Sequence, residues 1–253
     1  MRLFAITLSI TCGLAAVLFG ISLTLLLPFV EMADALRAAA TVGGLPMLAF
    51  PKVTEFVEQQ QGKKNLATGK RTPIYDFRGF QIAWPLMVVV GTLVLWSVGQ
   101  LVGGIATAIL AEAAGQMPKA SHVAIFSGAA SILGAYFVGR WIGTRCSRRG
   151  VVTMLLAAFF AAIASVAMDV ALLSDELYRA AFDAERLAPS HLLSRIAVVT
   201  LLFLVPGLLG YWRGRKHRLS KYLHYLLGVL PAETRDTVVE LAFDEAQKIA
   251  SAT

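Results

Sequence analysis

Long apolar segments alternate with short polar ones along the chain. Residues 3–30, 83–110, 122–143, 151–173 and 191–212 each hold an almost uninterrupted run of apolar residues. Every run reaches the roughly 20 residues that an α-helix needs to cross the hydrocarbon core of a bilayer. The pattern predicts an all-α fold, in which residues 1–212 form a polytopic transmembrane helical bundle of five spans and residues 213–253 form an amphipathic tail.

Residues 34–50 are a less apolar stretch that fits no span cleanly. Gly43, Gly44 and Pro46 fall in its middle, and these residue types disfavour the interior of a stable helix. The stretch is compatible with a short sixth span, a re-entrant segment or an interfacial helix, and we expect an element that does not span. Five spans would place the two ends of the chain on opposite sides of the membrane. Six would place them on one side, which Arg2 slightly favours.

The composition supports a membrane location. The chain is 57% hydrophobic and 15% charged, whereas soluble domains carry about 25% charged residues. Its net charge of +7 indicates orientation rather than a nucleic-acid partner, because Lys and Arg collect on the cytoplasmic side of membrane proteins. The basic residues lie mainly in the loop of residues 52–81, in residues 145–149 and just after residue 212. We therefore expect a bacterial cytoplasmic (inner) membrane, with loop 52–81 and the C-terminus in the cytoplasm.

Three charged residues and one glutamine fall inside the predicted spans, where an unpaired charge is costly. Asp169 and Arg195 lie at matching depths in the fourth and fifth spans, so we predict an ion pair that holds two helices together, with a proton or ion relay as the alternative. Gln100 lies mid-span, where an amide bonds to another helix or lines a polar pathway. Arg140 lies near enough to the cytoplasmic end of the third span for its side chain to reach the headgroups.

Two spans carry small residues at four-residue intervals. The second span has Gly99 and Gly103, and the third has a longer row: Ser127, Ser131, Ala135, Gly139 and Gly143. Small side chains let helix backbones approach closely, which is how helices associate in lipid. The rows are compatible both with a seam inside one chain and with an interface between chains.

The tail holds two predicted amphipathic helices of opposite charge. The first has apolar residues at helical spacing and a basic cluster suited to a membrane surface with anionic headgroups: Arg213, Arg215, Lys216, Arg218 and Lys221. The second, after Pro231, has a net negative charge and an apolar stripe: Val238, Val239, Ala242, Phe243, Ala246 and Ile249. Because an anionic leaflet repels acidic residues, we expect this stripe to dock a partner protein or another protomer.

The sequence shows no catalytic motif, and no cofactor is predicted. His122 and His191 lie at predicted outer ends of spans and are weak candidates for a metal site, because no ligand spacing accompanies them. We therefore expect a non-enzymatic membrane subunit, which assembles through small-residue helix faces and docks a partner or protomer through its tail. The alternative is a homo-oligomeric channel or small-solute transporter that uses Gln100, Asp169 and Arg195.

Overall fold

The computed structural model describes residues 2–30, 32–69, 80–114, 120–146, 149–171, 189–237 and 240. These residues form helices and turns with no strand among them, so the all-α prediction is confirmed. The helices are α1 (Arg2–Leu26), α2 (Met32–Ala67), α4 (Trp84–Ala114), α5 (Ala120–Arg145), α6 (Gly150–Ala171), α8 (Pro189–Lys216) and α9 (Arg218–Val229).

Among the described residues, three helices are long and apolar enough to cross a membrane. Within the described residues their apolar stretches are Phe4–Leu26, Gly150–Met168 and Ser190–Lys216, and a shorter one covers Trp84–Gly99. The chain is therefore a helical membrane protein by length and composition. Residues 83–110 and 122–143 lie largely in α4 and α5, but their crossing of the membrane stays a prediction.

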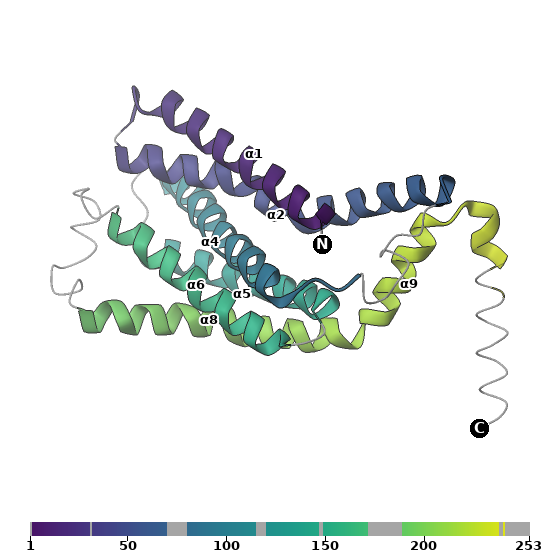
Figure 1. Ribbon diagram of the computed structural model, residues 1–253. Helices are drawn as coiled ribbons and strands as arrows, with labels where there is room; N and C mark the ends of the chain where they lie inside the picture. The colour runs from purple at the N-terminus through teal and green to yellow at the C-terminus, as the bar shows by residue number, and fades with distance from the viewer. Residues whose placement is uncertain are drawn as a thin grey trace.

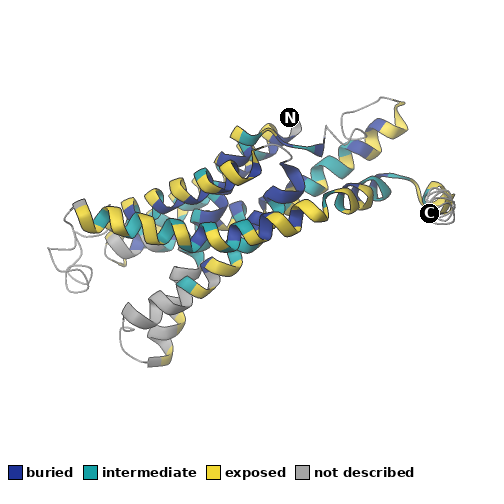
Figure 2. Ribbon diagram, turned by 90° about the horizontal axis from the view of Figure 1, so that it is seen from below, coloured by how far each residue is buried: buried dark blue, intermediate teal, exposed yellow. Residues whose placement is uncertain are grey.

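The helices pack side by side as a bundle (Figure 1). α1 packs on α2, α2 on α4, α4 on both α5 and α6, and these two on α8. Buried residues follow the inner helix faces, whereas exposed ones follow the outside (Figure 2). α1 exposes large apolar side chains, as suits contact with lipid: Ile6, Ile10, Leu14, Val17, Ile21 and Leu25.

α2 includes residues 34–50 in one continuous helix despite their low helix propensity, and the expectation that this stretch does not span the membrane stays a prediction. It runs unbroken from Met32 to Ala67, although Pro46 and Pro51 lie inside it, and its second half replaces most of the loop expected at 52–81. Its glycines are contact points rather than helix breaks. A Cβ added to Gly43 would lie 3.0 Å from the Phe19 Cβ of α1, and one added to Gly44 would lie 3.3 Å from the Ser97 Cβ of α4. Tertiary packing therefore outweighs their low helix propensity.

α5 and α8 approach each other most closely. A Cβ added to Gly139 of α5 would lie 1.9 Å from the Gly207 carbonyl oxygen of α8. Gly210 and Gly214 of α8 approach the α5 carbonyls of Tyr136 and Arg140 equally closely, at 2.0 and 2.1 Å from an added Cβ. The part of the predicted small-residue row that includes Gly139 therefore forms a seam within one chain.

One end of the bundle carries a projecting layer, which we call the platform: α2 residues 52–67, Phe80 and α9. Phe80, Tyr222 and Tyr225 form its small apolar core. The N-terminus lies at this same end, because Phe4 stacks edge-on against Phe50, 5.3 Å between ring centroids, just before the platform begins. Figure 1 shows the platform extending beyond the start of α1.

Candidate functional site: the buried ion pair and groove of the platform

A buried ion pair joins the platform to the bundle. Arg145 ends α5 with a side chain that is 1% exposed, and its Nη2 lies 2.8 Å from Glu58 Oε2 of α2. Its Nη1 donates to the Phe80 carbonyl at 3.2 Å, and its guanidinium carbon lies 4.0 Å from the Phe80 ring centroid. Arg145 is well placed at a helix C-terminus, where the helix dipole favours a cation.

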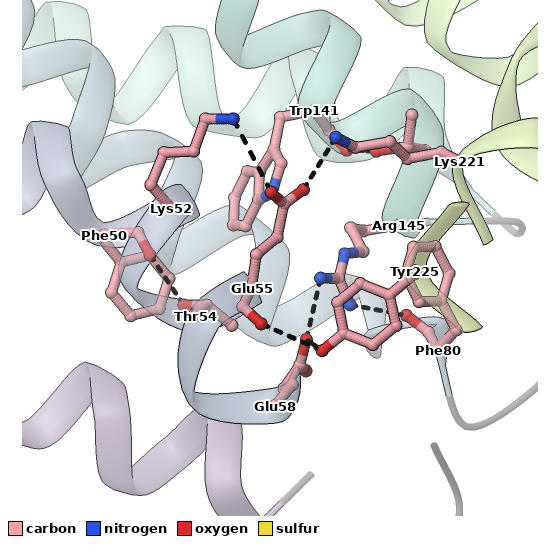
Figure 3. A network of polar contacts seen from close by, with 11 residues as sticks. Phe50, Lys52, Thr54, Glu55, Glu58, Phe80, Trp141, Arg145, Lys221 and Tyr225 are labelled. Atoms are coloured by element: carbon pink, nitrogen blue, oxygen red, sulfur yellow. Dashed lines mark hydrogen bonds and ion pairs between the residues drawn. The ribbon is translucent and has the colours of Figure 1, made fainter. Parts of the chain in front are cut away.

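Tyr225 of α9 completes this cluster. Its hydroxyl donates to Glu58 Oε2 at 2.9 Å and reaches the Glu55 carbonyl at 3.3 Å. Figure 3 shows Arg145 and Tyr225 directed at Glu58 from different elements. A buried ion pair stabilises only when its remaining hydrogen-bonding groups find partners, and here the partners come from α2, α5, α9 and the segment before α4.

Two further contacts fix α9. Lys221 Nζ lies 3.1 Å from Glu55 Oε1. The Arg218 guanidinium donates to the carbonyls of Gly143, at 2.9 Å, and Cys146, at 2.7 Å, at the end of α5. The last carbonyls of an α-helix have no partner within the helix, so Arg218 caps the C-terminus of α5 from another element. Partial burial lowers the pKa of Arg218 from its ordinary value, but the residue stays cationic because that value is so high.

Tyr225 should resist ionisation. Burial, and after it the Glu58 carboxylate, raises the pKa of its phenol well above the ordinary value of about 10. Since the folded chain holds this proton more tightly than the unfolded chain, the resulting stability is fully present below about pH 10 and is lost as the pH rises further. The stability advantage of the parent protein over Tyr225→Phe is therefore expected to shrink above that pH.

This prediction is measured by unfolding in mixed micelles at several alkaline pH values. The ultraviolet absorbance of tyrosinate, taken as the difference between parent and Tyr225→Phe, reports the titration directly. Ionisation of Tyr225 at the pH of a tyrosine in the unfolded chain would contradict the arrangement.

A groove of about 590 Å³ lies at the far end of the platform, between the last turns of α2 and α9. Its lining combines apolar residues, among them Leu66, Val229 and Leu230, with the two basic residues Lys63 and Arg235. The Nε of Arg235 donates to the Leu230 carbonyl at 3.0 Å, which holds the guanidinium beside the groove. This shape and charge suit an acidic segment with an apolar face.

The structure describes the side chains of two of the four predicted intramembrane residues, Arg140 and Arg195. α6 and α8 do lie side by side, and Arg195 is half-buried, but the side chains of Asp169 and Gln100 lie outside the described residues, so the ion pair stays a prediction. Arg140 is exposed. His191 is exposed, the side chain of His122 is outside the described residues, and no metal-binding group of side chains occurs within the described ones.

The tail residues divide into two groups. Arg213, Arg215 and Lys216 are exposed, whereas Arg218 and Lys221 have the internal partners given above. The predicted docking stripe lies outside the described residues: Val238, Val239, Ala242, Phe243, Ala246 and Ile249.

Sequence reasoning missed the central cluster. Glu58 and Tyr225 were not singled out, and Arg145 was counted only as a topological charge. One signal was present: in α2 the buried residues Phe50, Thr54, Gly62 and Asn65 follow a helical period, which indicates that the segment packs on protein. Comparison of the chain with protein-family models, curated proteins and solved structures finds no match.

Proposed function

We propose that the chain is a non-enzymatic membrane subunit whose platform docks a partner protein or a second protomer. The observation that carries this proposal is the platform itself. Glu58, Arg145 and Tyr225 tie a polar extension of the bundle into one rigid unit that presents an open groove. Burying an ion pair to hold a helical extension costs desolvation free energy. A rigid extension of this kind is suited to presenting a docking surface.

The groove complements the acidic part of the tail. Its lining combines Lys63 and Arg235 with apolar residues, and the predicted second tail helix combines an apolar stripe with acidic residues such as Glu240 and Asp244. A second protomer or another subunit with the same chemistry would fit the groove in the same way. The tail stripe would in turn dock on such a partner.

Assembly within the membrane is proposed to use α1. The row on α5 is occupied by α8, but α1 exposes a row of small residues that nothing in the described chain covers: Ala5, Ser9, Gly13, Ala16 and Gly20. No atom lies within 4 Å of a Cβ added to Gly13 or Gly20. This face would let a neighbouring helix approach closely.

The orientation is part of the same proposal. α1 and α2 pack along each other, and the N-terminus lies at the end that carries the platform, as six crossings would place it. We propose that this end faces the cytoplasm of a bacterial cell, because the exposed cations Arg213, Arg215 and Lys216 lie there.

Site-specific cross-linking tests the docking role. A photoreactive amino acid at Leu66, in the groove, is expected to give a discrete protein adduct in intact membranes, identified by mass spectrometry as a second copy or another chain. The same amino acid at Leu193, an exposed residue at the opposite end of α8, serves as the control. An adduct pattern at Leu66 identical to that at Leu193, or no protein adduct, would refute docking at the groove.

Transport remains the second candidate, because α4 holds buried polar atoms without partners among the described residues. These are Thr92 Oγ1, Trp96 Nε1 and Ser97 Oγ, within about two turns of Gln100. Such atoms are normally hydrogen-bonded, and water in a polar pathway would supply the bonds. Solute flux into vesicles that contain the purified chain, reduced by Gln100→Leu, would favour transport over the docking role.

A further inference from the structure

The outer face of the junction between α8 and α9 combines exposed apolar and basic residues in one place. We call it the junction face: Leu209, Trp212, Leu219 and Leu223, with Arg213, Arg215 and Lys216. His217 is the one residue between the two helices. Its N–H donates to the Gly214 carbonyl of α8 at 3.2 Å, and its carbonyl accepts from Lys221 N of α9 at 2.9 Å. The junction face therefore lies where α9 turns away from the line of α8 (Figure 1).

The apolar side chains of the junction face are open to the surroundings. Leu209, Trp212, Leu219 and Leu223 are between 51% and 61% exposed. Indole rings favour the boundary between the acyl chains and the headgroups of a bilayer. Exposed leucines next to an indole ring favour the same boundary. Leu209 and Trp212 lie on the exposed face of an apolar helix that is long enough to cross a membrane, so the junction face continues a face suited to lipid contact.

The opposite face of α9 prevents these leucines from turning inward. Tyr222, Tyr225 and Val229 are buried, and Arg218 holds the start of α9 to the end of α5. α9 is therefore clamped along one side, and rotation that buried Leu219 and Leu223 would break the cluster around Glu58.

The cations of the junction face have no protein counter-ion in the described part of the chain. No Asp or Glu occurs between Glu185 and Glu233 in the sequence. The nearest acidic residues of the platform are already engaged, Glu55 by Lys221 and Glu58 by Arg145. Arg213, Arg215 and Lys216 are exposed and take part in no ion pair that involves a described residue.

We propose that the junction face binds anionic phospholipid headgroups of the adjacent leaflet, with Leu219 and Leu223 seated among the upper acyl chains. Each basic side chain near a membrane surface contributes about fivefold to the preference for anionic over neutral lipid, so three would give up to about a hundredfold. In this arrangement the bilayer surface positions the platform, whichever partner occupies the groove. The inference does not depend on the docking role.

Fluorescence quenching in vesicles tests the proposal with the full chain. Trp212 emission is obtained as the difference between the parent protein and Trp212→Phe. At equal mole fractions, phosphatidylglycerol with brominated acyl chains is expected to quench Trp212 more than brominated phosphatidylcholine does. The quenching should correspond to a relative affinity at least tenfold higher for phosphatidylglycerol at the site beside Trp212. In the triple variant Arg213→Gln, Arg215→Gln, Lys216→Gln, this preference is expected to fall to about twofold or less. Equal quenching of the parent by the two lipids would overturn the proposal.

Two further measurements separate the junction face from a general effect of charge. Lys64→Gln removes an exposed cation at the far end of α2, outside the lining of the groove, and should leave the preference unchanged. A loss equal to that of the triple variant would overturn the assignment to this face. With Trp212→Phe as background, Leu223→Trp should add emission that either brominated lipid quenches, and a new tryptophan that neither quenches would show that α9 does not lie on the bilayer.

Discussion

Replacing Gly139 with alanine is expected to destabilise the bundle by about 1–3 kcal/mol, the usual cost of overpacking a tight interior. The new Cβ would lie 1.9 Å from the Gly207 carbonyl oxygen and 2.6 Å from its carbonyl carbon. These are backbone atoms, so no side-chain rotation relieves the contact and α5 must move away from α8. The gain of up to about 1 kcal/mol in helix propensity from glycine to alanine is too small to offset that movement.

Gly13→Ala is the matched control, because it makes the same chemical change in a helix that faces outward. No atom lies within 4 Å of a Cβ added to Gly13, so the helix-propensity gain acts alone and stability should stay equal or rise slightly. Both variants are compared by unfolding in mixed micelles at rising mole fractions of sodium dodecyl sulfate. Equal stability of Gly139→Ala and Gly13→Ala would contradict the close contact of α5 and α8.

The same pair of glycines separates packing from assembly. If α1 associates with a neighbour as proposed, Gly13→Ala should lower the population of oligomers while it leaves the unfolding of the single chain unchanged. Gly139→Ala should destabilise the single chain and leave the population of oligomers unchanged. The oligomeric population is read by native mass spectrometry of the protein in nanodiscs.

The positions of most helices could be predicted from the sequence, because a lipid-facing helix needs a long apolar run. Few other structural elements contain such a run. The run at 151–173 matches α6, Gly150–Ala171, to within two residues at each end. α2 could not be predicted in this way. Gly43 and Gly44 lower helix propensity when considered alone, and only the positions of Phe19 and Ser97 on neighbouring helices show why small residues are needed there.

The central cluster escaped prediction for a different reason. Charge counting treats every loop arginine alike, and it takes Arg145 and Arg149 as equivalent topological signals. In the structure Arg145 is buried against Glu58, whereas Arg149 is exposed with its guanidinium carbon 5.3 Å from the Trp84 ring centroid. The partners of Arg145 are 65 to 87 residues away in sequence, at Phe80 and Glu58, and no local pattern encodes such pairing.

Replacing Arg145 with methionine is expected to cost about 3–5 kcal/mol and to release α9 from the bundle. The loss leaves the Glu58 carboxylate in a mostly buried position, where the Tyr225 hydroxyl is its remaining donor among the described residues. Arg145→Lys should be almost as harmful, since one ammonium group cannot stack on Phe80 while it donates to both Glu58 and the Phe80 carbonyl. Arg140→Met is the control, because it removes an exposed arginine from the same helix.

A double-mutant cycle distinguishes a buried pair from a general role of arginine at this position. Glu58→Leu combined with Arg145→Met removes both charges, so no unpaired ion remains and most of the lost stability should return. Hydrogen exchange of the α9 amides provides the second readout: fast in Arg145→Met, slow again in the double variant, and unchanged in Arg140→Met. Additive losses in the double variant would mean that Arg145 and Glu58 act independently, and the cluster would then not be what holds the platform to the bundle.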